Sequence, residues 1–155
     1  EVSLKEFSEI TELRCILEPL ALTKSIEAGG DDWESTLVLA HHKLTKLEKK
    51  SSGAIGLPNI EWPSAHKKFH EALVNSCPSK NLLVMRESLF KQSERYRFLA
   101  SSMSSKKRNP IKEHKDLFEA AIDRNTQLAS TLITEHLNLT AKNLHEILLD
   151  KRLAL

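Results

Sequence analysis

Four histidines, His66, His70, His114 and His136, are spaced so that they could bind one metal ion. His66 and His70 lie four residues apart, which places both imidazoles on one face of a helix. His114 and His136 each follow the apolar periodicity of their own segment, so we expect both to project inward. Neutral imidazole is a good ligand for zinc, nickel, copper and iron(II). The spacing therefore predicts a buried metal site, with zinc as the expected ion and nickel or another divalent metal as the alternative.

Each histidine taken alone has a simpler interpretation as an ordinary core residue, because a neutral imidazole needs only one donor and one acceptor. Four such residues on three predicted helices favour metal binding over that interpretation. The remaining histidines, His41, His42 and His145, fit exposed helix faces, and we assign them no role.

The sequence supports catalysis at this site only weakly. The two residues after His66 are both Lys, so the HExxH pattern of zinc proteases is absent. Glu71 and Glu113 adjoin candidate ligands, but neighbouring positions on a helix point about 100° apart, so neither is well placed as a general base. An all-imidazole site leaves the charge of the ion uncompensated and should attract an anion. A metal-dependent hydrolase and a bundle that only mediates interactions remain as alternatives.

Three arginines are candidates for holding that anion. Arg14 interrupts the apolar stripe of the first helix, and a buried guanidinium needs an anionic partner. That partner could be a structural one such as Glu18, or a carboxylate ligand bound by both guanidinium nitrogens. Arg86 and Arg97 share one face of a later helix and could add positive charge, or could lie exposed at the edge of the bundle.

The apolar periodicity predicts an all-α protein, an antiparallel bundle of about six helices in one domain. The stripe Phe7, Ile10, Leu17 and Ala21 marks the first helix, in which Pro19 should cause a kink or a local break. The segment 43–50, KLTKLEKK, has the composition of a solvated face. Loops are expected at 51–59 and 104–109. The predicted helices cover residues 3–28, 31–49, 63–75, 80–103, 110–122 and 126–149.

Composition limits the classes of protein to which the chain could belong. With 155 residues, 40% hydrophobic residues and 5% aromatic residues, it has the size and composition of one domain without a sheet. A net charge of +2 gives no broad basic surface for nucleic acid. No apolar run reaches the roughly 18 to 20 residues of a membrane span, and no signal peptide opens the chain. Cys15 and Cys77 are predicted to be reduced thiols of a cytoplasmic protein, with a disulfide between them as the alternative.

These residues resemble the effector-binding FCD domain of GntR-type bacterial transcription regulators of the FadR subgroup, over nearly the whole chain. Arg14, Glu18 and Pro19 match the Arg-x-x-x-Glu-Pro pattern of the family's first helix. HKKFHEAL at 66–73 resembles its Asp-x-x-Phe-His segment. EHKDLFEAAI and LASTLITEHL, at 113–122 and 128–137, resemble its two later histidine segments. Within the family, the chain looks similar to regulators of carbon-starvation and glutarate catabolism operons.

The resemblance implies a non-enzymatic repressor domain that binds a small carboxylate, such as the dicarboxylate glutarate, over a metal ion. It further implies a homodimer and an upstream winged-helix domain that binds DNA in place of this segment. The chain begins at Glu1 without Met, which fits a missing amino-terminal domain. The family's first metal ligand is usually Asp, and this chain has His66 there. If His66 is not a ligand, His70, His114 and His136 remain, with open positions for the effector or water.

Overall fold

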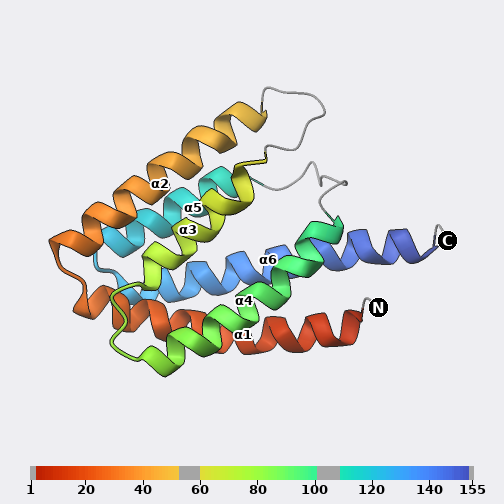
Figure 1. The fold of residues 1–155 in the computed structure, drawn as a ribbon, viewed down its shortest axis with the longest axis horizontal. Helices are drawn as coiled ribbons and strands as arrows, with labels where there is room; N and C mark the ends of the chain where they lie inside the picture. The colour runs from red at the N-terminus through yellow and green to blue at the C-terminus, as the bar shows by residue number, and fades with distance from the viewer. Residues whose placement is uncertain (1–2, 53–59, 101–108, 154–155) are drawn as a thin grey trace.

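The computed structural model describes residues 3–52, 60–100 and 109–153, and over these residues it is a bundle of six helices without strands, as the sequence predicts (Figure 1). Residues 51 and 52 of the loop predicted at 51–59 belong instead to the second helix, and residues 53–59 lie outside the described residues. The predicted end of the fourth helix at 101–103, and residues 104–108 of the loop predicted at 104–109, also lie outside them. The helices are α1 (Leu4–Ala28), α2 (Asp31–Ser52), α3 (Trp62–Val74), α4 (Lys80–Ala100), α5 (Pro110–Ile122) and α6 (Thr126–Leu153).

Side-chain caps fix where several helices begin. The side chains of Ser3, Asn109 and Asn125 each accept a hydrogen bond from the first turn of the following helix, at 3.1, 3.1 and 3.0 Å. Pro63 and Pro110 occupy first-turn positions, where a missing N–H costs nothing. The predicted caps at Asn109 and Asn125 are confirmed.

Two local predictions about helix continuity need correction. Helix α1 runs without interruption through Pro19, so the local break expected there is absent. The proline removes a single backbone hydrogen bond, a loss that the packing of α1 against α6, α4 and α3 can offset. Helix α6 continues four residues beyond the predicted end at Leu149.

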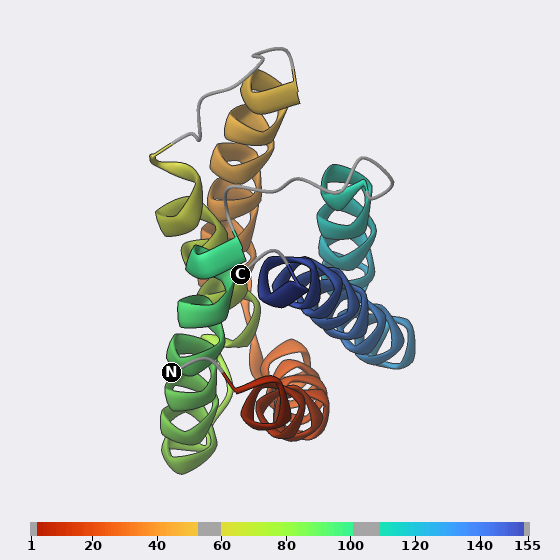
Figure 2. The same ribbon diagram turned by 90° about the vertical axis from the view of Figure 1, so that its right-hand side faces the viewer.

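The helices form two groups, which are joined by contacts of α1 with α3 and of α5 with α6. Helix α1 packs most extensively on α6 and α4, while α2 packs on α3 and α5. Figure 2 shows α6 between α5 and α1, with α3 and α4 on the opposite side. The larger apolar cluster includes Leu22, Leu37, Phe69, Leu117 and Ile133, and a smaller one gathers Phe7, Ile10, Tyr96, Leu144, Ile147 and Leu148. The helices that carry the four histidines therefore face one another across the interior.

The α1–α2 connection is held by close contacts. A Cβ atom on Gly29 would lie 2.6 Å from a ring carbon of Trp33, so this position has room only for glycine. Arg124, at φ 59° in the α5–α6 turn, donates to the carbonyls of Ile26 and Gly29, both at 2.6 Å, and pairs with Glu34. The turn that joins α5 to α6 is thus tied to the end of α1.

The cysteines are both free thiols, Cys77 buried and Cys15 partly buried, so a disulfide between them is absent. Among the described residues, we find no helix with the length and hydropathy needed to cross a membrane.

Candidate metal centre

The structure brings His66, His70, His114 and His136 together in the interior. One ring nitrogen from each lies within 4.8 Å of the others, and the four residues are 1 to 4% exposed. Helix α3 supplies the first two, one turn apart, with their Nε2 atoms separated by 3.1 Å. Helices α5 and α6 supply the other two, whose ring centroids are 4.9 Å apart. Three helices thus contribute to one cluster of four imidazoles.

The arrangement fits a metal ion of the size of zinc. Two nitrogens bound to one tetrahedral zinc at about 2.0–2.1 Å would lie roughly 3.3 Å apart, close to the separation of the two α3 imidazoles. Among the described residues, Nδ1 of His70 and Nε2 of His114 are buried without a hydrogen-bond partner. A buried polar atom without a partner is costly, and an ion that binds His70 through Nε2 would remove that cost at Nε2 of His114, not at Nδ1 of His70.

The two histidines of α3 are held in the neutral form that a metal requires. Burial is the main cause that lowers the pKa of His66 well below its usual value, and the Arg97 guanidinium adds to the effect. Burial likewise lowers the pKa of His70, with His136 and His114 as further causes. One ring nitrogen of each histidine therefore keeps its lone pair at neutral pH.

Two glutamates that the sequence analysis did not select contact the cluster. Glu48 Oε1 lies 2.8 Å from Nδ1 of His114, and Glu113 Oε1 lies 3.1 Å from Nδ1 of His136. Since a carboxylate only accepts, each Nδ1 must carry the proton, which leaves Nε2 as the nitrogen with a lone pair. The two carboxylates thus set the tautomer of both rings.

The prediction of a solvated face at 43–50 is therefore wrong. Leu44 and Glu48 are 0% and 4% exposed, and they continue the buried stripe that begins with Trp33 and Leu37 on α2. This spacing of seven, then four, residues is the signal that could have identified Glu48 as inward-facing. The four lysines of the segment obscured it.

From the sequence, Glu113 can be assessed as a general base only relative to His114, its neighbour in the chain. It points away from that ring as expected, yet it reaches His136 on α6, a contact that requires knowledge of how the helices pack.

Glu71 forms a surface ion pair with Lys67 at 3.3 Å. His41 is half-buried and stacked on Phe118 at 4.2 Å, so its assignment to an exposed face is wrong.

The arginines of α1 and α4 form a buried charge network. Glu18 accepts from Arg14 Nη2 at 2.9 Å and from Arg86 Nε at 2.7 Å. Arg14 also donates to Ser93 Oγ at 2.8 Å, and both guanidinium groups lie over the ring of Phe90. The structural interpretation of Arg14 is thus present, and the exposed interpretation of Arg86 is wrong. One carboxylate between two guanidinium groups leaves an excess of positive charge.

Arg97 connects the arginines with the histidines. Its Nη1 lies 3.0 and 3.1 Å from the two ring nitrogens of His66, and the side chain is 19% exposed, so the bundle-edge interpretation is wrong here too. Arg97 and Arg14 line an internal cavity of about 10 Å³ together with Ser93 and Thr140. That space holds about one water, so a larger anion would have to displace side chains.

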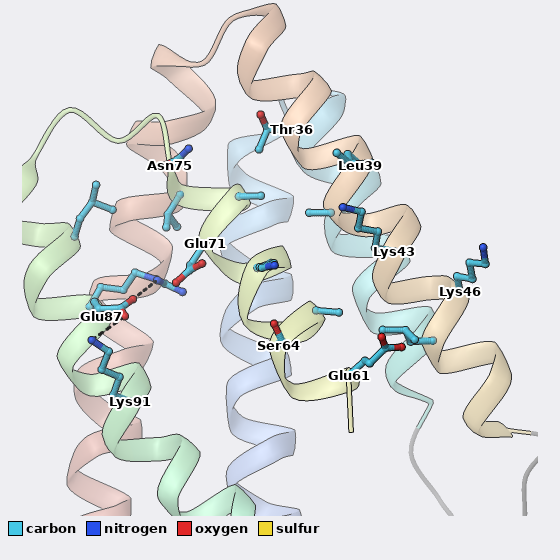
Figure 3. Close-up of a pocket in the computed structure, with 18 of the residues that line it drawn as sticks. Thr36, Leu39, Lys43, Lys46, Glu61, Ser64, Glu71, Asn75, Glu87 and Lys91 are labelled. Carbon is cyan, nitrogen blue, oxygen red and sulfur yellow. Dashed lines mark ion pairs between the residues drawn. The ribbon is translucent and has the colours of Figure 1, made fainter. Parts of the chain in front are cut away.

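Two of the larger depressions at the surface lie on helices that carry the cluster. A groove of about 1360 Å³ runs between α2, α3 and α4 and is lined by Lys43, Lys46, Glu71, Glu87 and Lys91 (Figure 3), but by none of the four histidines. A smaller depression of about 560 Å³ between α5 and α6 is lined by Glu113 and His136. The second depression is therefore the one that borders the imidazole cluster.

Comparison with known proteins places the chain in context. The model of the FCD domain matches residues 9–139. The HTH-type transcriptional repressor GlaR of Escherichia coli K12 is 35% identical, with 88% of this chain and 63% of GlaR covered. An uncharacterized HTH-type transcriptional regulator, BphR of Paraburkholderia xenovorans LB400, is 31% identical, with 88% of this chain and 56% of BphR covered.

A solved structure shows the same fold. The crystal structure of a GntR-family transcriptional regulator from Pseudomonas syringae pv. tomato DC3000 matches with a TM-score of 0.82 at 20% identity, covering 99% of this chain and 61% of the other. The chain spans 56 to 63% of the length of these three proteins.

Proposed function

Since the chain belongs to the FCD domain family, we propose that it is the effector-binding domain of a bacterial transcription repressor, built around a metal ion held by His66, His70, His114 and His136. The observation that carries this proposal is the convergence of four buried imidazole nitrogens within 4.8 Å. Zinc is the expected ion, since imidazole suits it and the cluster offers four ligands.

The effector is a small carboxylate, for example a dicarboxylate such as glutarate. Support comes from the guanidinium groups beside the cluster: Arg14 and Arg86 share the carboxylate of Glu18, and Arg97, which pairs with Glu94, also contacts His66. Arg14 and Arg97 border the internal cavity, and guanidinium groups bind carboxylates through two parallel hydrogen bonds. When bound, the metal supplies a further positive centre for a carboxylate oxygen.

Sensing is favoured over hydrolysis by the placement of the acidic side chains. A metal-dependent hydrolase needs a general base beside a metal-bound water. Glu48 and Glu113 are engaged with the Nδ1 atoms of His114 and His136. Each glutamate therefore holds a candidate metal ligand and is not placed as a general base. The relatives are also named as transcriptional regulators.

The rest of the protein is proposed to be an amino-terminal winged-helix domain that binds DNA as part of a cytoplasmic homodimer. The DNA-binding part of this proposal is supported by the names of the relatives, which are HTH-type transcriptional regulators and of which the chain spans only part. Helix α1 carries Arg14 and begins where the upstream region would join. Tyr96, next to Arg97, donates a 2.6 Å hydrogen bond to Glu6 near that start. Effector binding would thereby shift the population of domain orientations.

Calorimetry tests the proposed function. Zinc-loaded and chelated protein are titrated with a panel of monocarboxylates and dicarboxylates, with a neutral diol of equal length as the control ligand. We expect heat from a subset of the acids with the loaded protein only. Absence of binding in both forms across the panel would remove the sensing function.

A further inference from the structure

We propose that Glu48 and Glu113 are positioning residues of the metal centre, which fix the orientation and tautomer of His114 and His136 and lower the net charge of the site. This inference rests on the proposed function, because it concerns the same ion. The two residues are called the outer carboxylates below. They come from α2 and α5, neither of which supplies His66 or His70.

The contacts of the outer carboxylates are alike. Each places Oε1 against the Nδ1 atom of a buried imidazole from a different helix, at 2.8 Å for Glu48 and 3.1 Å for Glu113. Glu48 also accepts from Trp62 Nε1 at 3.4 Å, and Trp62 stacks on His66 at a centroid distance of 4.5 Å. Glu48 thus touches the surroundings of the cluster from two sides, through His114 and through Trp62.

This geometry has a definite chemical effect. An imidazole that binds a metal while it donates from Nδ1 to a carboxylate must offer the lone pair of Nε2, and the carboxylate makes that lone pair a stronger donor to the metal. Nε2 of His114 is the atom that lacks a hydrogen-bond partner among the described residues. The ring is therefore preset to offer that nitrogen to an ion, without the entropic cost of reorienting on binding.

Charge provides an independent argument. Four neutral imidazoles leave a divalent ion with a charge of +2, and the nearby carboxylates of Glu18 and Glu94 are already paired with Arg14, Arg86 and Arg97. Two carboxylates that contact the histidine ligands, and not the ion itself, offset that charge without occupying a coordination position. The outer carboxylates can thus help the site to keep its metal without displacing any of the four imidazoles.

The outer carboxylates differ in burial, and this gives a graded expectation. The Glu48 side chain is 3% exposed, while that of Glu113 is 19% exposed and borders the depression between α5 and α6. Solvent screens the charge of Glu113 more strongly. Removing the charge of Glu48 should therefore weaken metal binding more than removing that of Glu113.

The test uses Glu48→Gln, Glu48→Ala and Glu113→Gln, with Glu71→Gln as the matched control on the surface of α3. Zinc affinity is measured by competition with a chromophoric chelator, and histidine ¹⁵N shifts report the tautomer of each ring. We expect Glu48→Gln to lower zinc affinity roughly 10- to 100-fold. Glutamine still accepts from Nδ1–H of His114, so the tautomer of that ring should persist. Glu48→Ala should lose both the zinc affinity and the fixed tautomer. Glu71→Gln should bind zinc like the unchanged protein.

The outcomes separate this inference from the proposed function. If the unchanged protein binds zinc and carboxylates but Glu48→Gln and Glu113→Gln bind zinc equally well, only the role of the outer carboxylates is overturned. If the unchanged protein binds no zinc, both proposals fall together. Should Glu48→Gln fail to fold, Glu113→Gln decides the question, because its side chain is partly exposed and tolerates the change.

Discussion

His66 decides the charge of the proposed centre. Its Nε2 faces that of His70 at 3.1 Å, and Arg97 approaches both of its ring nitrogens. The family resembled by the sequence usually has an acidic residue at this position, so in the proposed centre a neutral ligand would replace a negative one. The exchange should make the site a stronger attractor of anions, with part of the loss offset by the outer carboxylates.

We expect His66→Asp to bind zinc at least as tightly as the unchanged protein and to bind carboxylates about tenfold more weakly, because the new carboxylate competes for the ion and for Arg97. A tenfold change is about 1.4 kcal/mol. Calorimetry of zinc-loaded protein measures both. His42→Asp, at an exposed position of α2, controls for the added charge. Unchanged carboxylate affinity in His66→Asp would place position 66 outside the metal centre.

Substitutions of Arg97 and Arg14 should differ in their effects on carboxylate binding and on the stability of the fold. Arg97→Gln removes a partly exposed cation and should abolish most carboxylate affinity with little loss of stability. Arg14→Ala should lower both, since Glu18 would keep only one of its two buried cationic partners, at a cost of up to about 3 kcal/mol. Urea unfolding and calorimetry on the same samples check the contrast. Equal destabilisation by the two changes would contradict it.

For the helices, the sequence predicts the capping residues that start them, but it does not predict which side chains meet between neighbouring helices. Asn109 with Pro110, and Asn125, act within one turn, so the sequence alone locates the starts of α5 and α6. The contact of Glu48 with His114 joins residues 66 positions apart on different helices, and its charged neighbours disguise it. The histidines were found because imidazoles on apolar stripes are conspicuous, whereas a buried glutamate among lysines is not.

The α1–α2 connection offers a paired test of packing. Gly29→Ala would place a Cβ 2.6 Å from the Trp33 ring, and the ring, held against Arg124, would have to move. We expect a loss of about 1–3 kcal/mol in the free energy of unfolding. Gly30→Ala is the matched control, because nothing lies within 4 Å of its Cβ. Urea denaturation measures both. Similar stabilities of the two variants would show that Trp33 shifts freely.

For the whole molecule, the buried imidazoles make the chelated protein sensitive to acid. The pKa values of His66 and His70 are lowered in the folded state, whereas both titrate near 6.5 when unfolded. As pH falls below about 6.5 the unfolded chain takes up protons first, so stability decreases, by up to about 1.4 kcal/mol per pH unit for each group.

Thermal unfolding of chelated protein between pH 7.5 and 5.5 measures this effect, with His66→Gln and His70→Gln as the comparison. These variants should show a shallower pH dependence than the unchanged protein. Equal slopes would mean that the two rings titrate normally in the folded state.

The central claim is that the four imidazoles share one ion, and diffraction data collected on either side of the zinc absorption edge test it most directly. Crystals of protein purified with zinc should give one anomalous peak per chain, enclosed by nitrogens of His66, His70, His114 and His136. An interior without such a peak, in which these nitrogens bond to water or to one another, would contradict the claim.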